Sequence, residues 1–96
     1  MTPMPMPVHP GRIIKREIEA RGISGHKLSL ELGIPPDRIS KILNAKRGIS
    51  ADTALRLGRY FATGPEFWMN LQTTYDLDMV ENQLGEEIRR RVHVAA

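Results

Sequence analysis

Residues 25–44 read GHKLSLELGIPPDRISKILN, a run in which leucine and isoleucine recur at helical spacing on both sides of a glycine. Leu28 and Leu32, four positions apart, predict a short helix that ends at Gly33. A second helix is predicted to begin at Pro35-Pro36, because the first N–H groups of a helix have no partner and proline is tolerated there. The connection between the two is too tight for an antiparallel hairpin and is typical of a helix-turn-helix. The apolar contacts that would fix the angle between the helices are Leu28, Leu32, Ile34, Ile39 and Ile42.

Two small residues support this geometry. Ser29 would let the second helix cross close above the first, and Gly33 would let the backbone take a positive φ at the turn. Capping residues mark helices on either side: His9-Pro10-Gly11 opens one that Gly22 ends, and Ser24 and Ser50 are good N-caps for two others.

The second half of the chain predicts two further helices. One opens at Gly64-Pro65 with aromatic residues at three- and four-residue spacing, and another could begin at Asp76. Gly85 would weaken the latter by about 1 kcal/mol relative to alanine. No stretch alternates apolar and polar residues as a strand would. The prediction is an all-α chain of five or six short helices.

Length and composition set the limits for this fold. The chain has 96 residues, 41% hydrophobic and 26% charged, which suits one compact domain. Because it has no cysteine, disulfides, thiolate zinc sites and a cysteine nucleophile are excluded. We expect no signal peptide and no membrane span, and therefore a cytoplasmic protein. The predicted organisation is a flexible Met/Pro arm over 1–8, a domain over 9–78 and a helical or disordered tail over 79–96.

Charge is unevenly distributed along the chain. Residues 23–63 carry seven basic and three acidic side chains, whereas residues 64–85 carry four acidic and no basic ones. A clustered basic surface suits a polyanion, while an acidic flank would be repelled from one and could meet a basic protein. A simple solvated charge distribution is the alternative.

Several segments together resemble one family. They are His9-Pro10-Gly11, residues 32–35, 38–40 and 42–44, residues 46–57, Tyr60-Phe61, residues 65–72 and residues 75–77. This pattern is similar to the HigA-type antitoxins within the Xre/Cro-like helix-turn-helix group. The resemblance implies a lambda-repressor-like all-α domain that dimerises and binds a palindromic operator in its own promoter. It also implies binding and neutralisation of a HigB toxin, a RelE-like ribonuclease that cleaves messenger RNA.

If the second helix of the motif enters the major groove, its early exposed residues face base edges. Lys41 could donate to guanine, Asp37 could accept from cytosine, and Pro36 could offer only an apolar contact. The predicted base-reading residues are Pro36, Asp37, Arg38, Ser40 and Lys41. An intrahelical Asp37–Lys41 ion pair is the alternative for two of them. The predicted phosphate contacts are Ser24, His26, Lys27, Asn44, Lys46 and Arg47. Ser24 and Asn44 could instead simply cap their helices.

An aromatic-rich stripe follows the basic segment. Core packing is one interpretation, and a symmetric helix–helix interface is the other. The predicted homodimer residues are Tyr60, Phe67, Trp68, Leu71 and Tyr75. The acidic flank comprises Glu66, Asp76, Asp78 and Glu81, which we interpret as either a solvated face or a docking surface for a basic toxin.

No enzyme is visible in the sequence, and no cofactor or metal is expected. His9, His26 and His93 are scattered and lack a metal-ligand spacing. Two other functions remain open: an orphan Xre-family regulator without a toxin, and a protein-interaction module that lacks DNA affinity.

Overall fold

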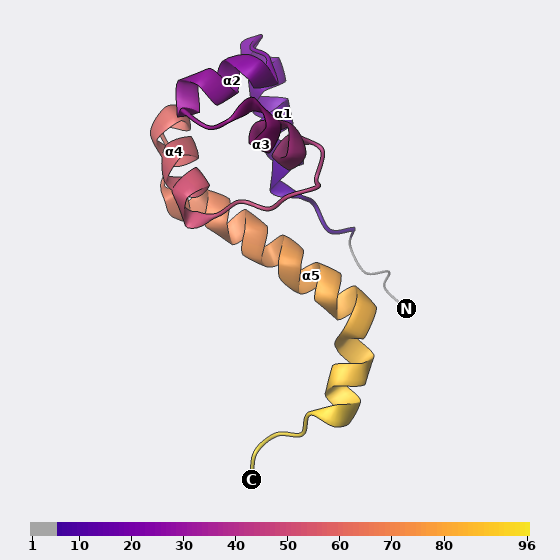
Figure 1. Cartoon of the computed structure of the whole chain (residues 1–96). Coiled ribbons are helices and arrows are strands. Elements are labelled where there is room, and N and C mark those ends of the chain that lie inside the picture. Colours follow the sequence, from indigo (N-terminus) through magenta and orange to yellow (C-terminus); the bar gives the residue numbers. More distant parts are fainter. Residues whose placement is uncertain (1–5) are drawn as a thin grey trace.

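The computed structural model describes residues 6–96, which form five helices and no strand. They are α1 (Pro10–Arg21), α2 (Gly25–Leu32), α3 (Pro36–Leu43), α4 (Ala51–Phe61) and α5 (Pro65–Arg91). The first four gather into one cluster, and α5 extends away from it toward the carboxyl end (Figure 1). The predicted all-α fold is confirmed. Residues 1–5 of the predicted arm lie outside the described residues. No described helix is both long and apolar enough to cross a bilayer.

The helix ends follow the capping residues. Ser24 accepts a hydrogen bond from the Lys27 backbone N–H at 3.0 Å, and Ser50 accepts one from Thr53 at 3.3 Å. Gly22 and Gly33 end α1 and α2 in the left-handed region, with φ of 69° and 67°. His9 caps α1, since its Nδ1 accepts from the Gly11 N–H at 2.9 Å.

The core of the helix cluster requires α1 and α3 to approach closely. A Cβ built on Gly11 would lie 1.9 Å from the carbonyl oxygen of Ile42, so only glycine fits between the two backbones. Around this contact lies one continuous apolar core, made of Ile14, Ile18, Leu28, Leu32, Ile34, Ile39, Ile42, Ile49, Ala54, Leu57, Phe61 and Trp68.

The fifth helix has two different halves. Its first half packs on α1 and α4 through Trp68, which is 1% exposed and whose indole N–H donates to Thr63 Oγ1 at 2.9 Å. Its second half projects beyond the cluster (Figure 1). The expected separate sixth helix from Asp76 is wrong, because α5 runs unbroken through both segments. The predicted boundary at residue 78 therefore falls inside a helix.

Gly85 does not end α5, for local reasons. A single helical glycine costs about 1 kcal/mol, which good helix-forming neighbours can offset. The Glu87–Arg91 pair at four-residue spacing and the pairing of Arg89 with Glu81 add to helix stability beyond Gly85. Three arginines in the last turn also lie where the helix dipole favours positive charge.

Candidate nucleic-acid interface

The turn between α2 and α3 is closed by backbone bonds. The Gly33 N–H donates to the Leu30 carbonyl at 3.3 Å, and the Ile34 N–H donates to the Ser29 carbonyl at 3.0 Å. Ser29 is 1% exposed, and its hydroxyl donates back to the His26 carbonyl at 2.6 Å. A larger side chain at this position would push α2 from its neighbours. The predicted roles of Ser29 and Gly33 therefore agree with the geometry.

One face of α3 is buried and the other is free. Ile39 and Ile42 are 2% and 1% exposed, which fixes the helix on the core. All the predicted base-reading residues lie outside this buried face: Pro36, Asp37, Ser40 and Lys41 are exposed and Arg38 is half-buried. This arrangement, two short helices joined by a glycine turn with the second presenting a polar face, defines a helix-turn-helix protein.

The alternative Asp37–Lys41 ion pair is present, with Lys41 Nζ 3.1 Å from Asp37 Oδ2. Both side chains are more than half exposed, at 52% and 80%, so the pair contributes only a few tenths of a kcal/mol. It holds Lys41 along the helix without preventing its release to a base edge. The pair and a base contact are therefore compatible.

Predicted phosphate contacts lie on both sides of α3. Lys27 on α2 pairs with Glu31 at 3.0 Å, and the hydrogen bond and charge of that carboxylate raise the pKa of Lys27. Ser24 caps α2, as its alternative interpretation expected. Asn44 ends α3, and its side-chain amide donates a long 3.4 Å bond to Ser40. His26, Lys46 and Arg47 are exposed.

The sequence interpretation missed cations on α1. Lys15 lines a hollow beside α3 together with His26, Ser40 and Asn44, and Arg12 and Arg16 line the adjoining one. These side chains stand next to the exposed face of α3 because Gly11 brings α1 against it. Their basic character was visible in the sequence, but their neighbourhood depends on a tertiary contact.

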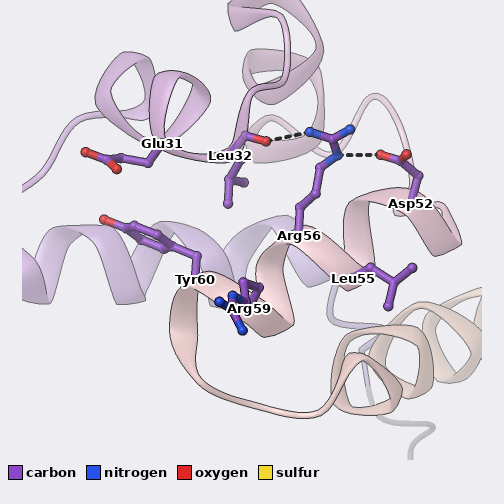
Figure 2. A pocket seen from close by; sticks show the side chains of 7 residues that line it. All are labelled: Glu31, Leu32, Asp52, Leu55, Arg56, Arg59 and Tyr60. Atoms are coloured by element: carbon purple, nitrogen blue, oxygen red, sulfur yellow. Dashed lines mark hydrogen bonds and ion pairs between the residues drawn. The ribbon is translucent and has the colours of Figure 1, made fainter.

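Arg56 connects α4 to the turn of the motif. Its Nη1 donates to the Leu32 carbonyl at 2.8 Å and to the Gly33 carbonyl at 3.4 Å, while its Nε donates to Asp52 at 2.8 Å. Figure 2 shows the guanidinium between the carbonyl of Leu32 and the carboxylate of Asp52. Arg56 therefore satisfies carbonyls left free at the end of α2 and ties the motif to α4.

A polar group below the loop at residues 44–50 connects it to α5. Gln72 accepts from the Ile49 N–H at 2.7 Å and donates to Asp76 at 2.9 Å.

His9 packs edge-on against Tyr75, with ring centroids 4.9 Å apart. Burial lowers the pKa of His9 from 6.5, against the opposing effects of the Arg47 backbone and the Asp76 charge.

The predicted dimer residues divide between the core and the surface. Trp68 is buried and Tyr75 packs on His9, so Trp68 in particular offers no side-chain surface to a partner. Tyr60 packs edge-on against Phe61 and is half-buried, as is Leu71. Phe67 is 47% exposed and is the most accessible of the five predicted residues.

The acidic flank does not form one face. Successive residues of a helix are about 100° apart, which places Asp76 and Asp78 on different sides of α5. Asp76 is held by Gln72, and Glu81 is paired with Arg89. This arrangement favours the solvated interpretation over a single acidic docking surface.

Comparison with known proteins agrees with this geometry. The helix-turn-helix family model matches residues 14–68. Virulence-associated protein I of Dichelobacter nodosus is 48% identical over 75 residues, covering 77% of this chain and 69% of that protein. An addiction module antidote protein of the HigA family from Coxiella burnetii has a TM-score of 0.91 and 42% identity, covering 95% of this chain and 100% of that one. The antitoxin HigA of Pseudomonas aeruginosa, solved with the higBA promoter, has a TM-score of 0.89 and 38% identity, covering 94% and 99%.

The fold, the exposed face of α3 and these similarities all indicate the same family. The chain belongs to the helix-turn-helix family and, within it, to the HigA-type antitoxins.

Proposed function

We propose that this chain is a cytoplasmic antitoxin of a HigBA-type module that represses its own promoter. As a homodimer it binds a palindromic operator, and it neutralises a RelE-like toxin that cleaves messenger RNA by binding it directly. The observation that carries the DNA-binding part is the free polar face of α3, backed by buried Ile39 and Ile42 and flanked on both sides by exposed cations. The Pseudomonas aeruginosa relative solved with promoter DNA supports the same assignment.

At the operator, α3 lies in the major groove. Lys41 donates to guanine O6 or N7 after leaving Asp37, and Arg38, at the edge of this face, reaches either a guanine or a phosphate. Pro36, Asp37 and Ser40 complete the base-reading set. The N-terminus of α2, with Ser24, His26 and Lys27, and the loop with Asn44, Lys46 and Arg47 hold phosphates on the two sides.

Dimerisation uses the projecting half of α5. Four residues there form an apolar stripe with exposures of 43–66%: Leu77, Val80, Leu84 and Ile88. Leu84 is sixteen residues from Trp68, which places it about 160° around the helix, on the side opposite the face that packs on the cluster. The stripe therefore cannot be covered by the chain's own core, and a second copy is the occupant that a twofold operator requires. Phe67 and Leu71 lie at the near end of the same helix.

The toxin is the least constrained partner. Small grooves lie between α2 and α4 (Figure 2) and beside Phe67 and Leu71, but neither carries a charge pattern that selects a basic protein over another partner. The orphan-regulator alternative predicts no toxin partner. A neighbouring reading frame for a small basic protein that co-purifies with this chain would support the antitoxin role, and failure to co-purify would favour the orphan regulator.

Operator binding is the test of the proposal. Fluorescence anisotropy would measure the affinity of the purified chain for its own upstream region and for an unrelated duplex of equal length, at 50 and 200 mM salt. We expect a steep salt dependence, in which each phosphate contact lowers log K by about 0.9 for every tenfold increase in salt concentration. Lys41→Ala should reduce the preference for the operator, whereas Lys46→Ala should weaken both duplexes equally. Weak and equal binding to both duplexes would leave only a protein-interaction module.

A further inference from the structure

The loop between α3 and α4, residues 44–50, is held by α3 only in its first half. The Ala45 N–H donates to the Ile42 carbonyl at 3.1 Å, and the Lys46 N–H donates to the Lys41 carbonyl at 2.8 Å. These two bonds form a Schellman ending, in which Ala45 takes the left-handed conformation with φ of 59°. Beyond Lys46 the loop has left α3, so another part of the molecule must determine where Arg47 and the following residues lie.

Gln72 of α5 holds the second half. Its side chain is buried, at 8% exposure, and its Oε1 accepts from the Ile49 N–H at 2.7 Å, across 23 residues of sequence. Its Nε2 donates to Asp76 Oδ1 at 2.9 Å. Because the amide oxygen and the amide nitrogen each have a partner, the orientation of the Gln72 side-chain amide is determined. The buried Ile49 side chain, 5% exposed, anchors the same residue in the core.

Gly48 lies directly against this amide. A Cβ built at Gly48 would be 2.9 Å from Gln72 Nε2 and 3.0 Å from both Cδ and Oε1. Among the described glycines only Gly22 and Gly33 have positive φ, so glycine at position 48 serves close approach rather than an unusual backbone conformation. The side chain of Gln72 and the loop backbone therefore fit as a matched pair.

We propose that Gln72 is a positioning residue for DNA binding, which holds the backbone at Gly48 and Ile49 so that Lys46 and Arg47 meet phosphates beside α3. The inference rests on the proposed function, since it assumes that the loop contacts DNA. Gln72 itself is buried and touches no DNA.

The charges around the loop agree with this role. Within residues 6–96 neither Lys46 nor Arg47 forms an ion pair, so no acidic side chain competes with a phosphate for them. The backbone of an unrestrained loop would lose conformational entropy on binding DNA. A loop already held at Ile49 reduces that loss.

The test compares three variants with the unsubstituted chain. Gln72→Met keeps the length and the helical preference of the side chain but removes the amide. Gln83→Met, at an exposed position of the same helix, is the matched control. Gln72→Glu combined with Asp76→Asn leaves the net charge unchanged and exchanges the carboxylate and the amide. The carboxylate at position 72 still accepts from the Ile49 N–H, and the amide at position 76 donates to that carboxylate.

Two readouts separate positioning from stability. Amide hydrogen exchange of Ile49, followed by NMR in the free protein, should be at least tenfold faster in Gln72→Met than in the control. In a dimer of Gln72→Met, the slope of log K against log salt should become shallower by about 1.8 if one cation per protomer loses its phosphate, and by about 3.6 if both do. Between 50 and 200 mM salt, the affinity advantage of the original chain over Gln72→Met should therefore shrink by about 12- to 150-fold. The double variant should restore both readouts.

The outcomes distinguish the inference from the proposed function. Unchanged exchange at Ile49, or faster exchange with an unchanged salt slope in a folded Gln72→Met protein, would overturn the positioning role. A double variant that folds but does not restore the slope would also overturn it. If the original chain shows no salt-dependent preference for its operator, and Lys46→Ala has no effect, the proposed function fails first and the positioning role fails with it. Faster exchange, a reduced slope and restoration together support the inference.

Discussion

Gly11→Ala tests the close approach of α1 to α3, and the sequence and the structure predict opposite signs for it. Since Gly11 is helical and has no positive φ, alanine should by propensity alone stabilise α1 by up to about 1 kcal/mol. The structure instead places the new Cβ 1.9 Å from the Ile42 carbonyl oxygen, far inside the 3.0 Å limit of real contacts. The obstructing atom is backbone, so the two helices must separate by on the order of 1 Å.

The cost can be worked from the buried isoleucines that α1 and α3 contribute to the core, which are Ile14, Ile18, Ile39 and Ile42. Each buried isoleucine contributes about 1.5–3 kcal/mol, and a gap of 0.5–1 Å removes roughly a quarter to a half of a packing contact. Over four side chains the loss is about 1.5–6 kcal/mol, which exceeds the gain in propensity. A net destabilisation of about 3 kcal/mol would lower Tm by about 12–24 °C.

Thermal unfolding followed by circular dichroism measures this directly. Gly22→Ala is the matched control, because it has open space around the new Cβ and only the strain of a positive φ, about 1–2 kcal/mol. We expect Gly11→Ala to be the more damaging of the two. A Gly11→Ala protein with a Tm equal to or above that of the original chain would refute the close approach.

Three further predictions use the same molecule. Ala45→Gly should raise the free energy of unfolding by about 1 kcal/mol, seen as a higher urea midpoint, because it removes a left-handed alanine; an unchanged midpoint would contradict it. Leu84→Glu should convert the dimer to a monomer in light scattering after gel filtration, while Leu55→Glu, also at an exposed leucine, should not. If both variants remain dimeric, the α5 interface is wrong. Because the fold lowers the pKa of His9, the unfolded chain binds more protons below about pH 6.5, and stability should fall as the pH falls through that value. The drop in Tm between pH 7.5 and 5.5 should be smaller in His9→Asn, and equal drops would exclude His9 as the cause.

The parts of the fold that the sequence predicted depend on neighbours along the chain. The caps at Ser24 and Ser50 and the turn at Gly33 are formed within a few residues, so local patterns suffice to place them. A new helix is predicted at Asp76 although no glycine or proline near it would end α5, and Gly85 is only a weak stop signal, so the two predicted segments form one helix.

The missed parts of the site depend on residues that meet only after folding. Arg56 and Gln72 act on backbone groups 23 or 24 residues away, and a single sequence gives no sign of such pairing. Ala45 and Ala62 take left-handed conformations where glycine or asparagine would have been the signal. Lys15 was visible as a cation but not as a neighbour of α3.

The unsupported second half of α5 links assembly to the folding of the helix itself. Its turns extend a helix that the packed first half has already nucleated, so they form by propagation alone, which is only weakly favourable in water. The turns beyond Val80 bury only Gly85, so they gain little from the rest of the monomer. If two copies pair along Leu84 and Ile88, helix formation and association become one equilibrium, and helical content becomes a function of protein concentration. A dilute sample would then lose both the last turns of α5 and the twofold arrangement of its two α3 helices in a single step.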